Sequence, residues 1–316
     1  MTDNINEIPE NEVTQEVPEE IKGKVMKEKD IESVSKKQVA MKVAVNIALY
    51  GFLIIMAVVV LFPFYWMLMS SVKTINEYNR TVPTLWPHEI RFETYKIAFN
   101  EISFGRIFLN TVFVGVVSTL LSLVITVLSA YAFARFDFKG KNALFAAMLA
   151  TMMIPGELFT ITNYITVVGW LSWDNTFTAL IVPFLVSVFY IYLLRQNFMQ
   201  IPNELYLAAK VDGTSDLKYL WKVMIPLAAP TLISITILKM MGSWNSYIWP
   251  NLVNTDKAYW LMTVALRQGN FTDQFSNPDY PSQMAAVVIV TIPLLLVFLF
   301  FRKYIMKGVS RSGIKG

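Results

Sequence analysis

The chain is organised around Ile201-Pro-Asn-Glu-Leu-Tyr-Leu-Ala-Ala-Lys-Val-Asp-Gly213, which belongs to a polar island at residues 196–226 between two long apolar stretches. This island is too polar to cross a bilayer and too regularly patterned for an unstructured loop. A helix fits directly after Pro202, because the first helical turn does not need the donor that proline lacks. Gly213 tolerates positive φ and ends that helix, after which Thr214 or Ser215 can cap a second one. We therefore predict a helix, a glycine turn and a second helix.

Composition places the rest of the chain in a membrane. Of its 316 residues, 55% are hydrophobic and only 16% are charged, whereas a soluble domain carries about a quarter charged residues. The chain has no cysteine, which excludes disulfides and thiolate metal sites. Its one histidine, His88, lies in a polar segment, where we expect a loop residue and no metal or catalytic role. The net charge is +4, and the basic residues cluster beside apolar runs. We therefore attribute the positive charge to the orientation of the chain in a membrane, and we expect no nucleic-acid partner.

Six apolar runs are each long enough to cross a bilayer as a helix of about 20 residues. They cover residues 43–69, 107–134, 143–168, 177–194, 227–249 and 284–301. The sequence therefore predicts an all-α membrane protein with six transmembrane helices in residues 43–303. The polar island, residues 196–226, joins the fourth and fifth helices. Residues 1–42 are expected to form a disordered tail, acidic and then basic, and residues 304–316 a second tail.

Basic residues predict how these helices are oriented, because Lys and Arg accumulate on the cytoplasmic side. They are concentrated in the N-terminal tail, in the link after the second run, in the polar island and in the C-terminal tail. The link between the third and fourth runs, residues 169–175, has neither Lys nor Arg. We therefore expect both termini and the polar island in the cytoplasm of a multi-pass protein of the cell membrane.

Two ionisable residues lie inside the predicted spans, Glu157 in the third and Lys239 in the fifth. Such residues are costly in a membrane and often mark a pathway. Both are expected at similar depth, so they could pair or line a route for solute; alternatively, Lys239 could extend to the interface or face a partner subunit. Trp244, Asn245 and Tyr247 follow on the fifth span and suit sugar rings, although an interfacial aromatic belt would have the same composition.

Three pairs of residues in the island have a distinctive spacing: Ala208-Ala209, Asp212-Gly213 and Ile225-Pro226. This spacing resembles the cytoplasmic EAA loop of permease subunits in binding-protein-dependent ABC importers. Three further strings resemble the carbohydrate-uptake, maltose-type group of that family: Tyr131-Ala-Phe-Ala-Arg135, Gly242-Ser-Trp-Asn-Ser-Tyr-Ile-Trp-Pro250 and the ending Lys307-Gly-Val-Ser-Arg-Ser-Gly-Ile-Lys-Gly316. The resemblance covers roughly residues 40–316.

The resemblance implies that the island is a coupling helix that fits a cleft on a cytoplasmic ATPase. The implied coupling residues are Glu204, Leu207, Ala208, Ala209, Asp212, Gly213, Thr214, Ser215 and Pro226. One departure from the family pattern is Leu207, which occupies the place where the family usually has Glu. We expect Glu204, one turn earlier, or the apolar surface of Leu207 and Tyr206 to take over the docking contact. The family position near Lys239 is more often small or apolar, so this lysine is interpreted as a mark of an anionic or strongly hydrogen-bonding solute.

The implied function is that of one transmembrane subunit of an ATP-driven importer, forming half of a pathway for a carbohydrate or related polar solute. The chain contains no G-x-x-x-x-G-K-[ST] motif, so ATP and Mg²⁺ are expected on a partner ATPase, with no catalytic residue, metal or cofactor in this chain. The implied partners are a second homologous permease, an ABC ATPase dimer, an extracytoplasmic solute-binding protein and membrane lipid. One alternative is a self-sufficient secondary transporter or channel, for which internal repeats are expected. Another is an intramembrane enzyme, for which Glu157 and Lys239 are the one candidate pair.

Overall fold

The computed structural model describes residues 28–273 and 275–310, which are predominantly helical. Within those ranges the only β-structure is an isolated bridge between Thr272 and Pro278. The all-α prediction is therefore confirmed. Of the predicted tails, residues 1–42 and 304–316, residues 1–27 and 311–316 lie outside the described residues, whereas residues 28–42 and 304–310 are helical.

Three helices are long and apolar enough to cross a membrane unbroken. They are α1 (Glu28–Ser71), α4 (Phe104–Arg135) and α15 (Tyr280–Ser310), with apolar spans at Gln38–Ser71, Phe104–Arg135 and Tyr280–Arg302. The chain divides into two compact units, residues 1–64 and 65–316. In its described part the first unit is the helix α1 alone, whose apolar side chains from residue 39 onward are mostly exposed.

The other three predicted spans are bent helix pairs. Lys141–Thr151 meets Gly156–Trp170 at 87°, Phe177–Phe184 meets Val188–Met199 at 46°, and Asp216–Leu227 meets Ala229–Trp244 at 80°. If each pair is one span, the total of six agrees with the sequence prediction. Pro155 lies at the first break. Proline has no backbone N–H to donate and disfavours helical backbone in the residue before it, so the helix ends there. Pro63 and Pro293, in contrast, stay inside α1 and α15.

Several short elements make up these bent pairs and the links between them. The first pair comprises α5 (Lys141–Thr151), the turn η2 (Gly156–Phe159), α6 (Thr160–Tyr164) and a π-helical turn, η3 (Ile165–Trp170). The second comprises α7 (Phe177–Ile181), η4 (Val182–Phe184) and α8 (Val188–Met199). Outside the spans lie α2 (Ile75–Tyr78), α3 (Glu93–Glu101), α13 (Ile248–Val253), η6 (Lys257–Tyr259) and α14 (Met262–Gln268).

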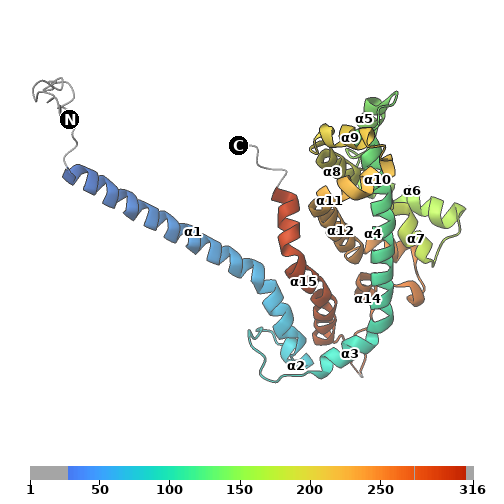
Figure 1. Ribbon diagram of the computed structural model, residues 1–316. Coiled ribbons are helices and arrows are strands. Elements are labelled where there is room, and N and C mark those ends of the chain that lie inside the picture. The colour runs from blue at the N-terminus through green and yellow to red at the C-terminus, as the bar shows by residue number, and fades with distance from the viewer. Residues whose placement is uncertain (1–27, 274, 311–316) are drawn as a thin grey trace, which may run out of the picture. The chain divides into compact units, whose positions relative to one another are not determined.

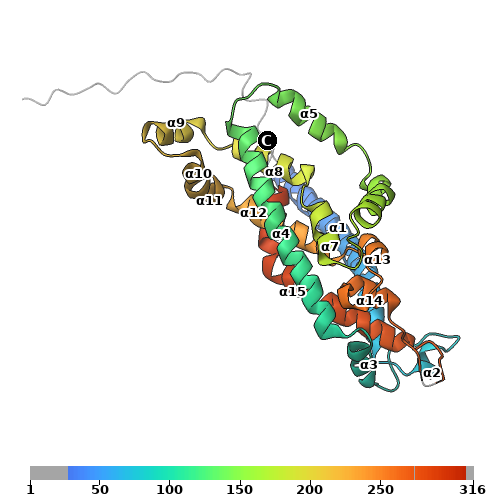
Figure 2. The ribbon, with the colours of Figure 1, turned by 90° about the vertical axis from the view of Figure 1, so that its right-hand side faces the viewer.

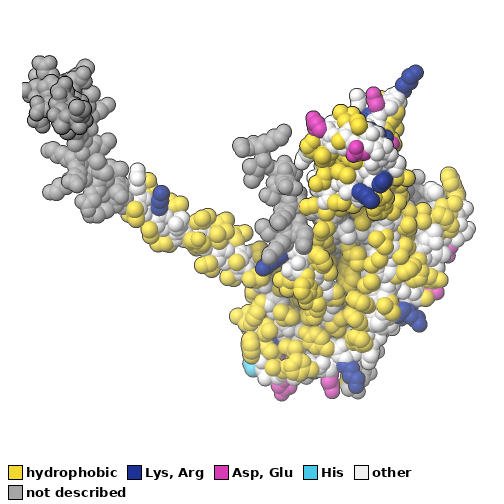
Figure 3. Space-filling view, viewed as in Figure 1, with side chains coloured by type: hydrophobic (Ala, Val, Ile, Leu, Met, Phe, Trp, Pro, Cys, Tyr) yellow, Lys and Arg dark blue, Asp and Glu magenta, His cyan; other side chains and the backbone are white. Residues whose placement is uncertain are grey.

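Within the second unit, α4 is the central helix. It packs against α8 and against α12 (Ala229–Trp244), and α12 packs in turn against α15. The buried face of α4 carries small side chains, among them Gly115, Ser118, Ser122 and Ala130, which allow helices to approach closely in a membrane. Figures 1 and 2 show α4 running from α3 at one end to α5, α8 and α9 at the other. Hydrophobic side chains cover most of the surface between these ends (Figure 3).

The segment from residue 71 to 106 forms the two short helices α2 and α3, and it is held by a buried carboxylate. Glu77 is 4% exposed and accepts hydrogen bonds from Thr84 Oγ1 at 2.6 Å and from the His88 backbone at 3.1 Å. His88 lies in a loop, as expected, and its Nδ1 is 2.8 Å from Glu77 Oε1. Burial alone would raise the pKa of Glu77, but the hydrogen bonds from His88 and Thr84 outweigh it and lower the pKa to about 2.

This network predicts an acid-sensitive contribution to stability. The folded pKa of Glu77 is below its ordinary value of 4.5, so the stabilisation is present above pH 4.5 and is lost as pH falls through about 2. We expect Glu77→Gln to lower the free energy of unfolding at pH 7 by about 2 kcal/mol, because hydrogen bonds to a charged group are lost. Thermal unfolding of the purified protein between pH 7 and about pH 2 measures both effects. The exposed Glu89→Gln is the control, and a Glu77→Gln protein as stable as wild type would contradict the assignment.

Candidate functional site

The polar island folds as a helix, a turn and a second helix, as predicted. Helix α9 (Asn203–Val211) ends where Gly213 adopts φ +69°, and the Thr214 amide donates to the Ala209 carbonyl at 2.8 Å. This closure satisfies carbonyls at the helix end. Ser215 caps the next helix, α10 (Asp216–Tyr219), by accepting from the Lys218 amide. A π-helical turn, η5 (Leu220–Met224), and α11 (Ile225–Leu227) then lead into α12.

Helices α9 and α10 project at the end of the second unit opposite α3 (Figure 2). The outer surface of α9 combines polar and apolar residues: Leu207 is 55% exposed and Val211 is 88% exposed, and Glu204 and Ala208 are also exposed. Ala209 is half-buried. A solvent-facing leucine and valine on a short, well-ordered helix are typical of a surface that another protein covers.

A carboxylate between the two helices fixes them to each other and to a membrane-spanning helix. Asp216 Oδ1 accepts from the hydroxyls of Tyr206 on α9 and Tyr131 on α4, each at 3.0 Å, and Oδ2 accepts from Lys210 Nζ at 2.8 Å. The hydrogen bond with Asp216 raises the pKa of Lys210. Tyr131 is on the buried face of α4, so its hydrogen bond connects the projecting helices directly to that membrane-spanning helix.

Arg135, at the end of α4, holds the base of the same projection. Its Nη2 donates to the carbonyls of Phe198 at 3.1 Å and Ile201 at 2.8 Å, and its Nη1 donates to Asn203 Oδ1 at 3.3 Å. These contacts satisfy acceptors at the end of α8. Beneath them lies a buried apolar cluster drawn from α4, α8 and the island, which includes Ala130, Leu194, Phe198, Tyr219, Leu220 and Met224.

Sequence reasoning missed this brace. It treated Tyr206 as part of a docking surface, whereas Tyr206 turns inward to Asp216 and packs edge-on against Tyr219. The available signal was the pair Tyr131 and Arg135, two polar side chains one turn apart at the end of an apolar span.

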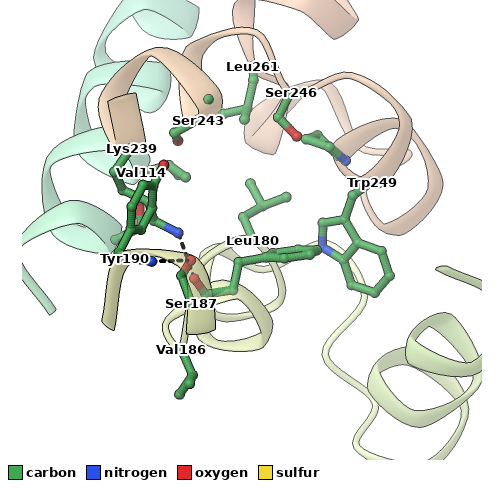
Figure 4. A pocket seen from close by; sticks show the side chains of 14 residues that line it. Val114, Leu180, Val186, Ser187, Tyr190, Lys239, Ser243, Ser246, Trp249 and Leu261 are labelled. Carbon is green, nitrogen blue, oxygen red and sulfur yellow. Dashed lines mark hydrogen bonds between the residues drawn. The ribbon is translucent and has the colours of Figure 1, made fainter. Parts of the chain in front are cut away.

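A cavity of about 370 Å³ lies between α4, the α7–α8 bend and α12, and Lys239 lines it. Lys239 Nζ donates to the Phe184 carbonyl at 2.6 Å, at the bend between α7 and α8. Figure 4 shows Lys239 beside Tyr190 in this cavity. Within the described residues no ion pair joins Lys239 to Glu157.

A second cavity, of about 570 Å³, adjoins the first through the shared lining residues Phe184, Ser246 and Trp249. Three of the predicted pathway residues line it: Glu157, Asn245 and Tyr247.

Trp244 and Trp249 differ in their relation to these cavities. Trp244 lies in neither lining; it is buried, with its ring 6.0 Å from that of Phe108. Trp249 is also buried and donates to the Ala179 carbonyl at 2.9 Å while lining both cavities.

The Asp216 brace predicts how firmly α9 is held. Asp216→Ala removes the acceptor of Tyr131, Tyr206 and Lys210, and losing hydrogen bonds to a charged group costs about 2 kcal/mol. We expect amide hydrogen exchange in α9 to accelerate by roughly tenfold or more, since 1.4 kcal/mol corresponds to a factor of ten. The matched control is Asp212→Ala, at the exposed end of α9. Equal exchange in the two variants would contradict the role of Asp216.

Comparisons with known proteins agree with this architecture. A model of the family described as "binding-protein-dependent transport system inner membrane component" matches residues 122–311. The arabinooligosaccharide transport permease AraQ of Bacillus subtilis is 30% identical, with 86% of this chain and 96% of that protein aligned. The diacetylchitobiose uptake permease NgcG of Streptomyces coelicolor is 31% identical over 83% of this chain and 87% of that protein.

A solved structure supports the same conclusion. A chain of a bacterial ABC transporter that imports the acidic polysaccharide alginate aligns with a TM-score of 0.73 and 26% identity, covering 84% of this chain and 96% of that one. With the family model covering more than half of its length, the chain belongs to the inner-membrane components of binding-protein-dependent transport systems, the permease subunits of ABC importers.

Proposed function

We propose that this permease forms half of the inward pathway for a carbohydrate or related polar solute, driven by a separate ATPase that docks on α9 and α10. The observation that carries the proposal is the projecting pair α9–α10, whose apolar residues Leu207 and Val211 are exposed while its base is fixed to α4 through Asp216 and Tyr131. A projection that is exposed at its surface and rigid at its base can transmit movement from a partner into the membrane-spanning helices.

The solute class is supported by the two cavities and by the relatives. Hydroxyl and amide groups with aromatic faces line the cavities, among them Ser243, Asn245, Tyr247 and Trp249, and such linings suit hydroxyl-rich ligands. AraQ and NgcG are named as permeases for oligosaccharides. The ring of Trp249 and the backbone around Phe184 border both cavities, so a solute could pass from one to the other along them.

In the proposed coupling, Leu207 replaces the usual acidic residue with an apolar contact, and Glu204 supplies a nearby charge. Both face outward, whereas Tyr206 is used internally. Closure of the ATPase pair on ATP would move α9, and the Asp216–Tyr131 bond and the Arg135 contacts would carry that movement to α4 and α8. ATP and Mg²⁺ are assigned to the ATPase, because this chain lacks the phosphate-binding loop.

The assembly proposed here includes a second permease, an ATPase dimer and an extracytoplasmic solute-binding protein, in a lipid bilayer. Reconstitution of all four components in proteoliposomes tests it. We expect ATP-dependent solute uptake and ATPase activity that rises with loaded binding protein. Uptake by this chain without the ATPase, driven by an ion gradient, would instead support the alternative of a secondary transporter.

The proposed orientation, with both termini and α9 cytoplasmic, can be tested by labelling, because the natural chain has no cysteine. Val211→Cys on α9 and Val82→Cys in the segment before α3 replace residues that are 88% and 78% exposed. We expect a membrane-impermeant maleimide to label position 82 on intact cells and position 211 only after permeabilisation, following the distribution of Lys and Arg. Labelling in the reverse order would overturn this topology.

The docking role of Leu207 predicts that a charge placed there breaks coupling. Leu207→Asp buries an unpaired carboxylate in the proposed interface, so we expect binding of the ATPase to weaken by at least tenfold and uptake to fall with it. Leu85→Asp is the matched control, since Leu85 is 62% exposed and lies in the segment before α3. Glu204→Ala measures the charged contribution separately. If Leu207→Asp and Glu204→Ala both leave ATPase coupling intact, the docking surface is elsewhere.

A further inference from the structure

The cavity that contains Lys239 has an excess of positive charge. No acidic side chain occurs among its lining residues, all of which belong to the described chain. The ammonium group has one protein acceptor there, the Phe184 carbonyl at 2.6 Å, although an ammonium can donate three hydrogen bonds. A lysine at this depth in a membrane protein is costly unless its charge is compensated.

The remaining polar groups of this cavity are hydroxyls that can turn toward a bound ligand. Ser243 on α12, Ser246 just after it and Tyr190 on α8 line the cavity. Their hydroxyls form no hydrogen bond with any other side chain or carbonyl in the part of the chain that the structure describes. In Figure 4, Lys239, Tyr190 and Ser243 lie together at one side of the cavity, and Ser246 lies farther along it, toward Trp249.

The apolar part of the lining includes an aromatic ring that can contact the face of a sugar ring. The side chains of Val114, Leu180, Leu261 and Trp249 border the same space, and the volume of about 370 Å³ is within the range of small-molecule sites. The cavity therefore combines one cation, several hydroxyls and an aromatic ring. This combination suits a hydroxyl-rich molecule that carries negative charge.

We propose that this cavity selects anionic carbohydrates, with Lys239 Nζ binding a carboxylate or phosphate of the solute while the serine and tyrosine hydroxyls contact its hydroxyl groups. This inference rests on the proposed function and adds the charge of the substrate to it. A lysine suits either anion, because it acts as a compact point charge with rotatable donors. The bound anion supplies the acidic partner that Lys239 lacks within the cavity lining. The Phe184 carbonyl keeps the Lys239 ammonium group oriented into the cavity.

Binding to the purified complex of both permeases and the ATPase, without nucleotide or binding protein, tests the proposal. Three probes are compared: trigalacturonate, glycerol 3-phosphate and the neutral maltotriose. We expect one or both anions to bind at least tenfold more tightly than maltotriose, with the two anionic probes distinguishing a carboxylate from a phosphate preference. Lys239→Met should abolish the difference, and Lys239→Arg should retain most of it.

The control is Lys96→Met, which removes an exposed lysine on α3 and should leave the preference for anions unchanged. Equal affinity for charged and neutral probes, a preference that survives Lys239→Met, or no binding of either anion at millimolar concentration would each overturn the inference. ATPase activity of the same Lys239→Met complex separates the two proposals: a complex that assembles and hydrolyses ATP but shows no anion preference refutes only the selection of anions.

Discussion

The carboxylate of Asp216 is the interaction on which the proposed function depends. It accepts hydrogen bonds from α4, from α9 and from Lys210, so one side chain joins the exposed helix to the central membrane-spanning helix. A short helix of nine residues has little stability of its own in water. Fixed at its base by Asp216 and Arg135, α9 can keep its shape while a partner pushes or pulls on it.

The pathway region also depends on a polar group that finds a partner inside the protein. Breaks in the α5–η2 and α7–α8 pairs release backbone groups from regular helical bonding, and one of these, the Phe184 carbonyl, accepts from Lys239. Irregular backbone at membrane depth is tolerated where it lines a cavity. The two cavities meet at that bend, so the breaks that interrupt two spans also border the polar space between them.

The positions of the six apolar segments and the helix-turn-helix island could be predicted from the sequence, because hydropathy, Gly213 and the basic links are local signals. The bends could not: the chain turns by 87° around Pro155, whereas Pro63 and Pro293 stay inside unbroken helices, so a proline in an apolar run does not by itself identify a bend. The brace could not either, since Tyr131 and Asp216 are 85 residues apart. The presence of Lys239 and Glu157 within apolar segments could be seen in the sequence, whereas their separation into adjoining cavities depends on how α12 and η2 pack.

The most direct test of the central claim is site-specific photo-crosslinking from position 211, at the exposed end of α9, in the assembled transporter. The account predicts one dominant product, between this chain and the ATPase subunit, whose yield changes when ATP is added. The same crosslinker at position 82 should not capture the ATPase. Crosslinks from position 211 to lipid or to the second permease alone, in a complex that contains the ATPase, would contradict the account.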